Sequence, residues 1–328
     1  MKVLVTGGGG FLGKRIVSML QREGHKVASI SRGKYPDLIS MNVECHQADL
    51  NDEVALKKAL EGVDAVIHTA AKVGIFGRYE DFYKTNVQGT QTLIKLMKEQ
   101  GVSYLVFTSS PSVIFGQEDL CGADETVAYP KKYINFYSAT KALAEKLVLE
   151  EGKKKDSLKT VSLRPHLILG SGDQNLFPRL LKAHLHGKLK KIGRGENLVD
   201  VIHVDNAAKA HLLALEKLVQ GRPSSGESYF LGQESPVNLW KFLNDIFVDL
   251  GVGPIEKSIP FSVAYQVGRI FEKVYAFQGR FEEDPPMTRF VALQLAKGHY
   301  FSQKKAQKDL DYYPFINLTQ LKTELIAH

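Results

Sequence analysis

Short apolar segments alternate with amphipathic segments along the first half of the chain. The apolar segments predict strands at Lys2–Thr6, Lys26–Ser31, Val43–Ala48, Asp64–His68, Ser103–Thr108 and Thr160–Leu163. The amphipathic segments predict helices at Phe11–Glu23, Asp52–Glu61, about Tyr79–Gln100 and Phe136–Glu151. Strictly alternating strands and helices are typical of a parallel sheet with helices on both faces. The predicted fold class is therefore α/β, with a doubly wound Rossmann sheet.

After about residue 170 the pattern becomes more helical. Asn238 is a plausible N-cap and Gly251 a stop for a helix whose apolar residues follow helical spacing, namely Leu239, Phe242, Leu243, Ile246, Phe247 and Leu250. We expect a dinucleotide-binding domain over residues 1–170 and a smaller, mostly helical substrate-binding region over residues 171–328. Some helices or strands of the second region can return to the first sheet.

Composition and charge narrow the function classes. The chain has 328 residues, 44% hydrophobic and 24% charged, and a net charge of +7, which suits an anionic small ligand. Its basic runs, such as 153–155, lack interleaved aromatic residues, which argues against nucleic-acid binding. No apolar run is long enough to span a membrane, and the start of the chain enters a strand directly, so we expect a cytoplasmic protein. Cys45 and Cys121 lie outside any metal-binding spacing, and no metal site is expected.

A glycine-rich turn follows the first predicted strand and reads TGGGGFLG from Thr6 to Gly13. Gly7 permits a tight turn, Gly10 lets the backbone approach a pyrophosphate, and Gly13 lets the helix pack closely on the strand. The free N–H groups at the start of the next helix then face the phosphates. The sequence therefore predicts a dinucleotide site here.

The end of the second predicted strand bears on the choice of cofactor. An NAD site normally has Asp or Glu there to bind the ribose 2′-hydroxyl. This chain instead has Ser31, Arg32 and Lys34, which offer donors and positive charge to a 2′-phosphate. We therefore favour NADP(H), with NAD(H) as the alternative.

Tyr137 and Lys141 form a YxxxK pair on a predicted helix, where the i, i+4 spacing places both side chains on one face. A cation beside a phenol lowers the pKa of that phenol, which makes Tyr137 a candidate general acid–base.

Taken in order, several motifs resemble the extended short-chain dehydrogenase/reductase superfamily over nearly the full chain. Besides the glycine turn and the YxxxK pair, they are Asp49-Leu50, the HTAA stretch at 68–71, the NVQGT stretch at 86–90, the TSS stretch at 108–110 and the LRP stretch at 163–165. The resemblance implies that Tyr137 donates a proton, that Lys141 binds the nicotinamide ribose, and that Ser110, or alternatively Ser109, bonds the substrate carbonyl. It assigns Asn86 to a helix kink and a proton relay. It also implies cofactor contacts at Gly7, Gly10, Phe11, Leu12, Gly13, Ser31, Arg32, Asp49, Leu50, Ala70, Ala71 and Pro165.

Within the superfamily, the segments Pro285–Phe290 and Tyr300–Ala306 resemble the branch of 3β-hydroxysteroid and sterol-4-carboxylate dehydrogenases. The start VLVTGGGGFLG, the SPSV stretch at 110–113 and the segment Leu163–Gln174 are most similar to bacterial 2-alkyl-3-oxoalkanoate reductases of olefin biosynthesis. That likeness implies NADPH-dependent reduction of a 2-alkyl-3-oxoalkanoate to the 2-alkyl-3-hydroxyalkanoate, a homodimer, and contact with other enzymes of the olefin pathway.

Three other functions remain open at this point. One is a 3β-hydroxysteroid or sterol-4-carboxylate 3-dehydrogenase. Another is a nucleotide-sugar epimerase, which the missing arginine in the segment Leu198–Asn206 disfavours. The third is a dinucleotide-sensing scaffold, a class that typically loses the tyrosine or the lysine that this chain keeps.

An alkyl-substituted oxo acid needs a long apolar cleft and a cation for its carboxylate. The cation could be Arg289, Arg194, Lys72 or His166. An aromatic-rich segment could line the cleft, rest on a membrane surface, or pack in the core of a helical region; it contains Phe261, Tyr265, Phe271, Tyr275, Phe277 and Phe281.

Overall fold

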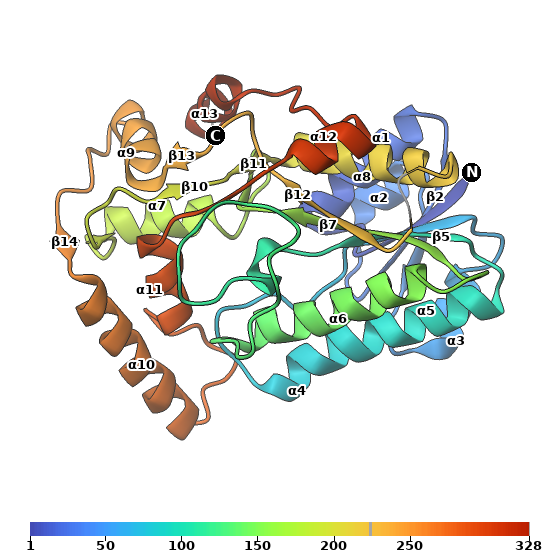
Figure 1. The fold of residues 1–328 in the computed structure, drawn as a ribbon, viewed down its shortest axis with the longest axis horizontal. Coiled ribbons are helices and arrows are strands. Elements are labelled where there is room, and N and C mark those ends of the chain that lie inside the picture. The colour runs from blue at the N-terminus through green and yellow to red at the C-terminus, as the bar shows by residue number, and fades with distance from the viewer. Residues whose placement is uncertain (223–224, 328) are drawn as a thin grey trace.

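The computed structural model describes residues 1–222 and 225–327, and its centre is a seven-stranded parallel sheet (Figure 1). The strands lie in the order β12 (Glu227–Leu231), β7 (Lys159–Pro165), β5 (Tyr104–Thr108), β4 (Ala65–His68), β1 (Lys2–Thr6), β2 (Lys26–Ser31) and β3 (Glu44–Gln47). The α/β fold with a doubly wound parallel sheet, predicted from the alternating pattern, is confirmed. β12 lies beyond residue 170 and still pairs with β7, so both halves of the chain contribute to this sheet.

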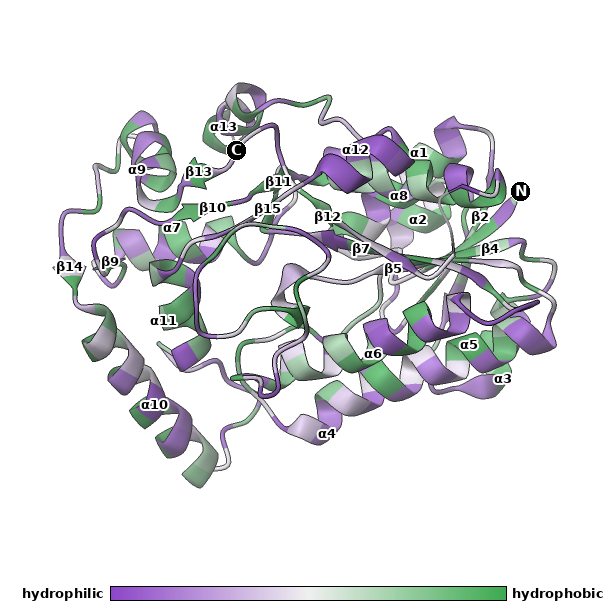
Figure 2. Ribbon diagram, viewed as in Figure 1, coloured by the Kyte–Doolittle hydropathy of each residue, from purple (hydrophilic) through white to green (hydrophobic). Residues whose placement is uncertain are grey.

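Both faces of the sheet are covered by helices because its strands are apolar on both sides. Val3 and Val5 of β1 pack against α1 (Phe11–Arg22) and α8 (Val204–Val219). Leu4, between them, points to the opposite face, which is covered by α3 (Glu53–Ala59), α5 (Gly89–Glu99) and α6 (Phe136–Gly152). Figure 2 shows the sheet between the two helical layers, with hydrophobic stretches in its strands.

The helix expected over residues 79–100 is divided into three parts. α4 (Tyr79–Phe82) leads into a π-helical turn, η1 (Tyr83–Gln88), and the chain then continues as α5. A π-helical turn holds an extra residue, and such turns occur frequently at functional sites. Asn86 lies within this turn and is buried.

The C-terminal region lies beside the carboxyl ends of the central strands and has its own apolar cluster, with Trp240, Phe247 and Leu321 among its buried members. The helix expected from Leu239 is α9 (Leu239–Asp249), and Asn238 caps it by accepting a hydrogen bond from the Lys241 N–H. The other elements there are β8 (Ile168–Leu169), α7 (Phe177–Leu185), β9 (Lys191–Ile192), β10 (Leu198–Val199), β11 (Ile202–His203), β13 (Val237–Asn238), β14 (Ser258–Ile259), α10 (Phe261–Phe277), α11 (Arg289–Ala296), β15 (His299–Phe301), α12 (Lys304–Leu310) and α13 (Leu318–Ala327). Earlier in the chain, α2 (Pro36–Ser40), η2 (Pro111–Val113) and β6 (Leu120–Ala123) complete the fold.

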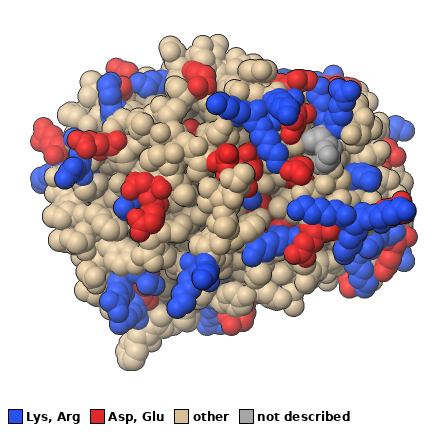
Figure 3. Space-filling model, in the orientation of Figure 1, with Lys and Arg blue, Asp and Glu red and all other residues tan. Residues whose placement is uncertain are grey.

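Acidic and basic side chains are interspersed on the face shown in Figure 3, and wide uncharged areas lie over the C-terminal region at the left. None of the helices in residues 1–222 and 225–327 combines the length and the apolar character that crossing a membrane requires.

Candidate active site

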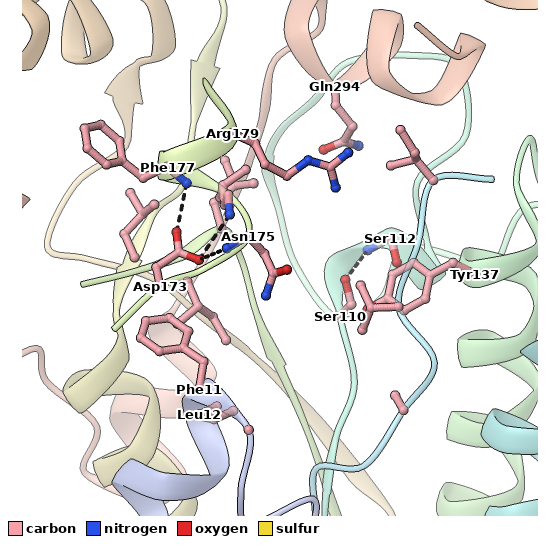
Figure 4. Close-up of a pocket in the computed structure, with 18 of the residues that line it drawn as sticks. Phe11, Leu12, Ser110, Ser112, Tyr137, Asp173, Asn175, Phe177, Arg179 and Gln294 are labelled. Atoms are coloured by element: carbon pink, nitrogen blue, oxygen red, sulfur yellow. Dashed lines mark hydrogen bonds between the residues drawn. The ribbon is translucent and has the colours of Figure 1, made fainter. Parts of the chain in front are cut away.

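A single cavity of about 1410 Å³ extends from the carboxyl ends of the central strands into the C-terminal region (Figure 4). In open α/β sheets this edge is where ligands bind. The volume exceeds that of a usual small-molecule pocket, about 300 to 1000 Å³, so it has room for two ligands. Of the catalytic and cofactor-contacting residues that the superfamily resemblance implies, Asn86 alone does not line this cavity. The others all do, and they are Gly7, Gly10, Phe11, Leu12, Gly13, Ser31, Arg32, Asp49, Leu50, Ala70, Ala71, Ser110, Tyr137, Lys141 and Pro165.

The turn between β1 and α1 has the backbone that a dinucleotide requires. Gly7 has a φ of +72°, and a Cβ on Gly13 would lie 2.2 Å from the carbonyl oxygen of Gly7. Glycine is therefore needed at both positions. The N-cap of α1 is Gly10, which brings no side chain to the first N–H groups of the helix. These groups carry partial positive charge and suit the phosphates of a nucleotide.

The neighbouring end of the cavity holds the residues expected around the adenosine. Arg32 is exposed there, beside Asp49 and Ser31. Burial by itself would raise the pKa of Asp49. Hydrogen bonds from Asn51 and the charge of Arg32 have a larger, opposite effect, so the pKa of Asp49 lies below its ordinary value. Lys34 is not among the lining residues, whereas Tyr35, which belongs to no sequence motif, is one of them.

Tyr35 lies against the glycine turn, since a Cβ on Gly9 would come within 2.2 Å of its ring. The Lys14 ammonium lies 5.6 Å from the centre of the same ring. Nothing in the local sequence distinguishes this tyrosine from an ordinary loop residue, and only the fold of the 32–35 segment brings it over the turn.

Tyr137 and Lys141 come from the first turns of α6. Asn135 begins this helix by accepting a hydrogen bond of 3.0 Å from the Ser138 N–H, which places Tyr137 in the first turn and toward the cavity. Ser110 follows β5 and accepts a hydrogen bond of 3.2 Å from the Ser112 N–H. Figure 4 shows the Ser110 hydroxyl beside the Tyr137 ring, on the same wall.

The expected lowering of the Tyr137 pKa by Lys141 is wrong for this structure. Burial raises the pKa of the Tyr137 phenol, and the Ser110 hydroxyl opposes that rise only in part. Burial also lowers the pKa of Lys141 to about 7, although the negative charge of Glu145 acts to raise this pKa. The Lys141 ammonium donates a 2.6 Å hydrogen bond to the Thr108 carbonyl and is thus directed toward the backbone at the end of β5. The phenol therefore stays protonated near neutral pH.

Asn86 reaches the site through its neighbours. Its amide group donates hydrogen bonds of 3.0 Å to the Lys72 carbonyl and to the Thr140 hydroxyl, and it accepts one of 2.8 Å from the Lys72 N–H. Thr140 directly precedes Lys141 in α6. Asn86 thus connects the π-helical turn, the segment after β4 and the helix that carries Tyr137.

Below Lys141 on α6, Glu145 anchors the helix to β7. It makes two hydrogen bonds of 2.9 Å with the Arg164 guanidinium, and both side chains are almost fully buried. Ser162 and Tyr129 donate further hydrogen bonds to the same carboxylate. A buried pair with this many partners holds α6 in one position on the sheet.

The structure does not favour any of the four residues considered above as the cation that binds a substrate carboxylate. Arg289 donates two 2.7 Å hydrogen bonds to Glu272, and it does not line the cavity. Arg194 and Lys72 do not line it either. His166 does line it, but burial and the neighbouring His299 hold its pKa well below the ordinary value, so it is neutral.

His166 and His299 form a directed pair. The His299 Nε2 lies 2.9 Å from the carbonyl oxygen of Gln294 and must donate to it. Its Nδ1 then accepts, at 2.6 Å, the hydrogen on the His166 Nε2. The Nδ1 of His166 therefore carries no hydrogen and acts only as an acceptor. It cannot donate a hydrogen bond to the carboxylate of a substrate.

The aromatic-rich segment does not line the cavity. None of its six aromatic residues is among the lining residues of the described chain. Phe261 and Tyr265 pack on the apolar cluster of the C-terminal region, and two others contact Phe76. Phe76 stacks on Phe281 at 6.0 Å and meets Tyr275 edge-on at 6.2 Å. Phe277, at the end of α10, is 94% exposed. The cleft is lined by aliphatic and phenylalanine side chains of other elements, including Leu176, Leu180, Leu243, Met287 and Phe290.

Comparison with known proteins places the chain in a family. The sequence model of the 3-beta hydroxysteroid dehydrogenase/isomerase family matches residues 4–262. The 2-alkyl-3-oxoalkanoate reductase of Stenotrophomonas maltophilia is 40% identical over 323 residues, which cover 98% of this chain and 97% of that protein. The protein of the same name from Shewanella oneidensis is 40% identical and covers 96% and 83%. A Mus musculus sterol-4-alpha-carboxylate 3-dehydrogenase, decarboxylating, is 33% identical and covers 97% and 88%.

Solved structures agree with the fold. The crystal structure of gox2253 has a TM-score of 0.80 and 28% identity, and the match covers 99% of this chain and 96% of that one. MoeE5 in complex with UDP-glucose and NAD has a TM-score of 0.77 at 24% identity, covering 100% and 98%. The second likeness extends to the fold alone.

Proposed function

Since the chain belongs to the 3-beta hydroxysteroid dehydrogenase/isomerase family, we propose that it is an NADP(H)-dependent oxidoreductase that interconverts a 3-oxo and a 3-hydroxy group. The proposed substrate is a 2-alkyl-3-oxoalkanoate, reduced to the 2-alkyl-3-hydroxyalkanoate. The observation that carries the proposal is that Ser110, Tyr137 and Lys141 line the same cavity as the glycine turn. The names of the two relatives that are 40% identical support the substrate class.

The reaction needs a hydride at the carbonyl carbon and a proton at the carbonyl oxygen. A bound nicotinamide dinucleotide would supply the hydride. Tyr137 donates the proton, and its raised pKa suits this role because the phenol is protonated when the substrate arrives. Ser110 donates a hydrogen bond to the same oxygen, a bond that strengthens as negative charge develops there.

The residues present fit such a cofactor. Phe11, Leu12 and Gly13 would present backbone N–H groups to the pyrophosphate, whereas the Gly10 N–H donates a 2.9 Å hydrogen bond to the Gly7 carbonyl. Asp49 and Leu50, which line the cavity, would flank the adenine, while Ala70, Ala71 and Pro165 would line the groove toward the nicotinamide. Lys141 would bind the nicotinamide ribose.

Arg32 and Ser31 are the residues that favour NADP(H) over NAD(H) as the cofactor. Arg32 is exposed within the cavity, where its guanidinium can meet a 2′-phosphate, and no carboxylate ends β2. A charge-assisted, two-pronged contact of this kind is the form of phosphate recognition that arginine supplies best.

A sterol-4-carboxylate 3-dehydrogenase is the second candidate, favoured by the family match and by the mouse relative. We further propose a homodimer that acts with other enzymes of olefin biosynthesis. A sedimentation run that finds a monomer at micromolar concentration would remove the dimer.

The test follows nicotinamide absorbance while the purified protein oxidises a racemic 2-alkyl-3-hydroxyalkanoic acid, with NADP⁺ and NAD⁺ in parallel. The oxidative direction is chosen because a free β-oxo acid decarboxylates before it can be assayed. Turnover with NADP⁺ in preference to NAD⁺ supports the whole proposal. Oxidation of a 3β-hydroxysteroid in place of the acid would transfer the protein to the second candidate.

A further inference from the structure

The C-terminal part of the cavity lining carries excess positive charge. From residue 173 onward the lining includes three cations, Arg179, Lys188 and Lys190, and two carboxylates, Asp173 and Asp284. The Asp173 carboxylate is already satisfied, because it accepts hydrogen bonds of 2.8, 3.1 and 2.8 Å from backbone N–H groups at the start of α7. Among the described residues of this part of the lining, Asp284 is therefore the one carboxylate whose charge is left to balance the three cations.

Arg179 extends from the first turn of α7 into the cavity, toward the side from which Gln294, Ser110 and Tyr137 project (Figure 4). Its Nη2 donates a 2.7 Å hydrogen bond to the Asp284 carboxylate. Within the described chain this is the only hydrogen bond of the guanidinium, although the group has five donors. The side chain is 56% exposed, so the remaining donors are open to a ligand that enters the cavity.

Gln294 supplies a neutral donor in the same place. It lies on α11, and its side chain points into the cavity beside Arg179 in Figure 4. Its backbone carbonyl holds His299, which fixes this part of the helix against the His166 pair. A guanidinium and an amide that converge from two elements form a suitable pocket for a carboxylate.

The proposed substrate needs such a pocket close to its reacting carbon. In a 2-alkyl-3-oxoalkanoate the carboxylate is attached to the carbon next to the carbonyl. The name of the mouse relative also describes an acid group on the carbon adjacent to the oxidised one, at positions 4 and 3. The two candidate substrates therefore share a carboxylate beside the reacting carbon.

We propose that Arg179, with Gln294, binds the carboxylate of the substrate, and that Asp284 holds the guanidinium in place for it. This inference rests on the proposed function. Lys188 and Lys190 are less suitable, because an ammonium offers no planar pair of donors. Arg179 thereby selects β-hydroxy and β-oxo acids over neutral ketones and alcohols of the same size.

The test compares two substrates on matched variants. Each enzyme oxidises a 2-alkyl-3-hydroxyalkanoic acid and the methyl ester of that acid, which keeps the reacting carbon and removes the charge. In Arg179→Gln the KM for the acid should rise about 10- to 100-fold, the loss expected for a charged hydrogen-bonded contact. The kcat for the acid and both constants for the ester should stay within about threefold. Arg179→Lys should restore part of the affinity, and Lys190→Gln, which removes a nearby cation, should behave as wild type.

Ester turnover serves as the folding control for every variant. If Arg179→Gln keeps the wild-type preference for acid over ester, or if Lys190→Gln loses it, the Arg179 assignment is overturned while the proposed function stands. If the wild-type protein oxidises neither compound, the proposed function itself has failed, and the two failures are thus distinguishable.

Discussion

The Lys141 ammonium lies 2.6 Å from the carbonyl oxygen of Thr108 and donates a hydrogen bond to it. Thr108 is the last residue of β5, and Ser109 and Ser110 follow it. The bond therefore fixes the helix that carries Tyr137 to the strand end that presents Ser110. The ammonium also lies 4.0 Å from the centre of the Phe107 ring, so the lysine is held from two sides.

Replacing Lys141 by Met should lower kcat by about 100-fold or more, since it removes both the cation near Tyr137 and the tie between α6 and β5. The KM for the cofactor should rise as well, because the ribose loses its partner. Steady-state kinetics of Lys141→Met and Lys146→Met provide the measurement. Lys146 lies on the same helix outside the cavity lining, and its variant should keep wild-type constants.

Asn86→Ala should lower kcat about tenfold or more while the KM for the cofactor changes less than threefold. The substitution leaves the Lys72 backbone without its partners and frees Thr140, so the wall around Lys141 loses its support. Thr90→Val is the matched control, because Thr90 donates to the Asn86 carbonyl from the same helix but not to the site. The Thr90→Val protein should unfold at a lower urea concentration than wild type and keep the wild-type kcat. Equal kcat losses in both variants would show a merely structural effect.

The sequence predicted the sheet well because parallel strands are continuous apolar segments that glycine and polar turns delimit. It could not predict the π-helical turn at Tyr83–Gln88, since that turn depends on Asn86 reaching Lys72 and Thr140, which are distant in sequence. β12 was also missed. Its last three residues, Tyr229 to Leu231, are aromatic or aliphatic and buried, but its place beside β7 is a tertiary pairing that local pattern does not encode.

Arg32→Gln should lower kcat/KM for NADPH about 10- to 100-fold and leave that for NADH within about threefold. A 2′-phosphate loses its charged partner in this variant, whereas a 2′-hydroxyl loses little. Lys34→Gln is the control, as Lys34 is exposed and outside the cavity lining. Equal losses with both cofactors in Arg32→Gln would contradict the NADP(H) preference.

Asp200 gives a prediction for stability. It is 2% exposed, and burial raises its pKa to about 7, although the Phe301 N–H donates a 2.8 Å hydrogen bond to it. Between about pH 4 and pH 7 the folded protein holds this proton and the unfolded chain releases it, so the contribution of Asp200 to stability falls as pH rises. The loss above pH 7 amounts to as much as about 4 kcal/mol.

Asp200→Asn keeps an acceptor for the Phe301 N–H and removes the titration. In urea unfolding it should match wild type near pH 4.5 and exceed it by a few kcal/mol at pH 8. Asp245→Asn should change in the opposite direction, because hydrogen bonds from Lys322 and Lys241 lower the pKa of Asp245 and stabilise its charged form. An Asp200→Asn protein less stable than wild type at pH 8 would contradict the prediction.

The site was partly accessible to sequence reasoning. The glycine turn, Ser110, Tyr137 and Lys141 stand in ordered motifs, and the structure brings them to one cavity. Arg179 and Tyr35 stand in no motif, and only the packing of α7 and of the 32–35 segment turns them toward the ligands. The raised pKa of Tyr137 was unforeseen, because the i, i+4 spacing predicts a cation nearby and does not show that the fold buries the phenol.

The most direct test of the proposed chemistry is the Tyr137→Phe variant, which removes one hydroxyl and little volume. Its kcat for the hydroxy acid is measured together with its dissociation constant for NADPH, followed by cofactor fluorescence. We expect a kcat lower by a factor of about 100 to 10,000, with a dissociation constant within about threefold of wild type. A variant whose kcat remains within tenfold of wild type would contradict the assignment of Tyr137 as the proton donor.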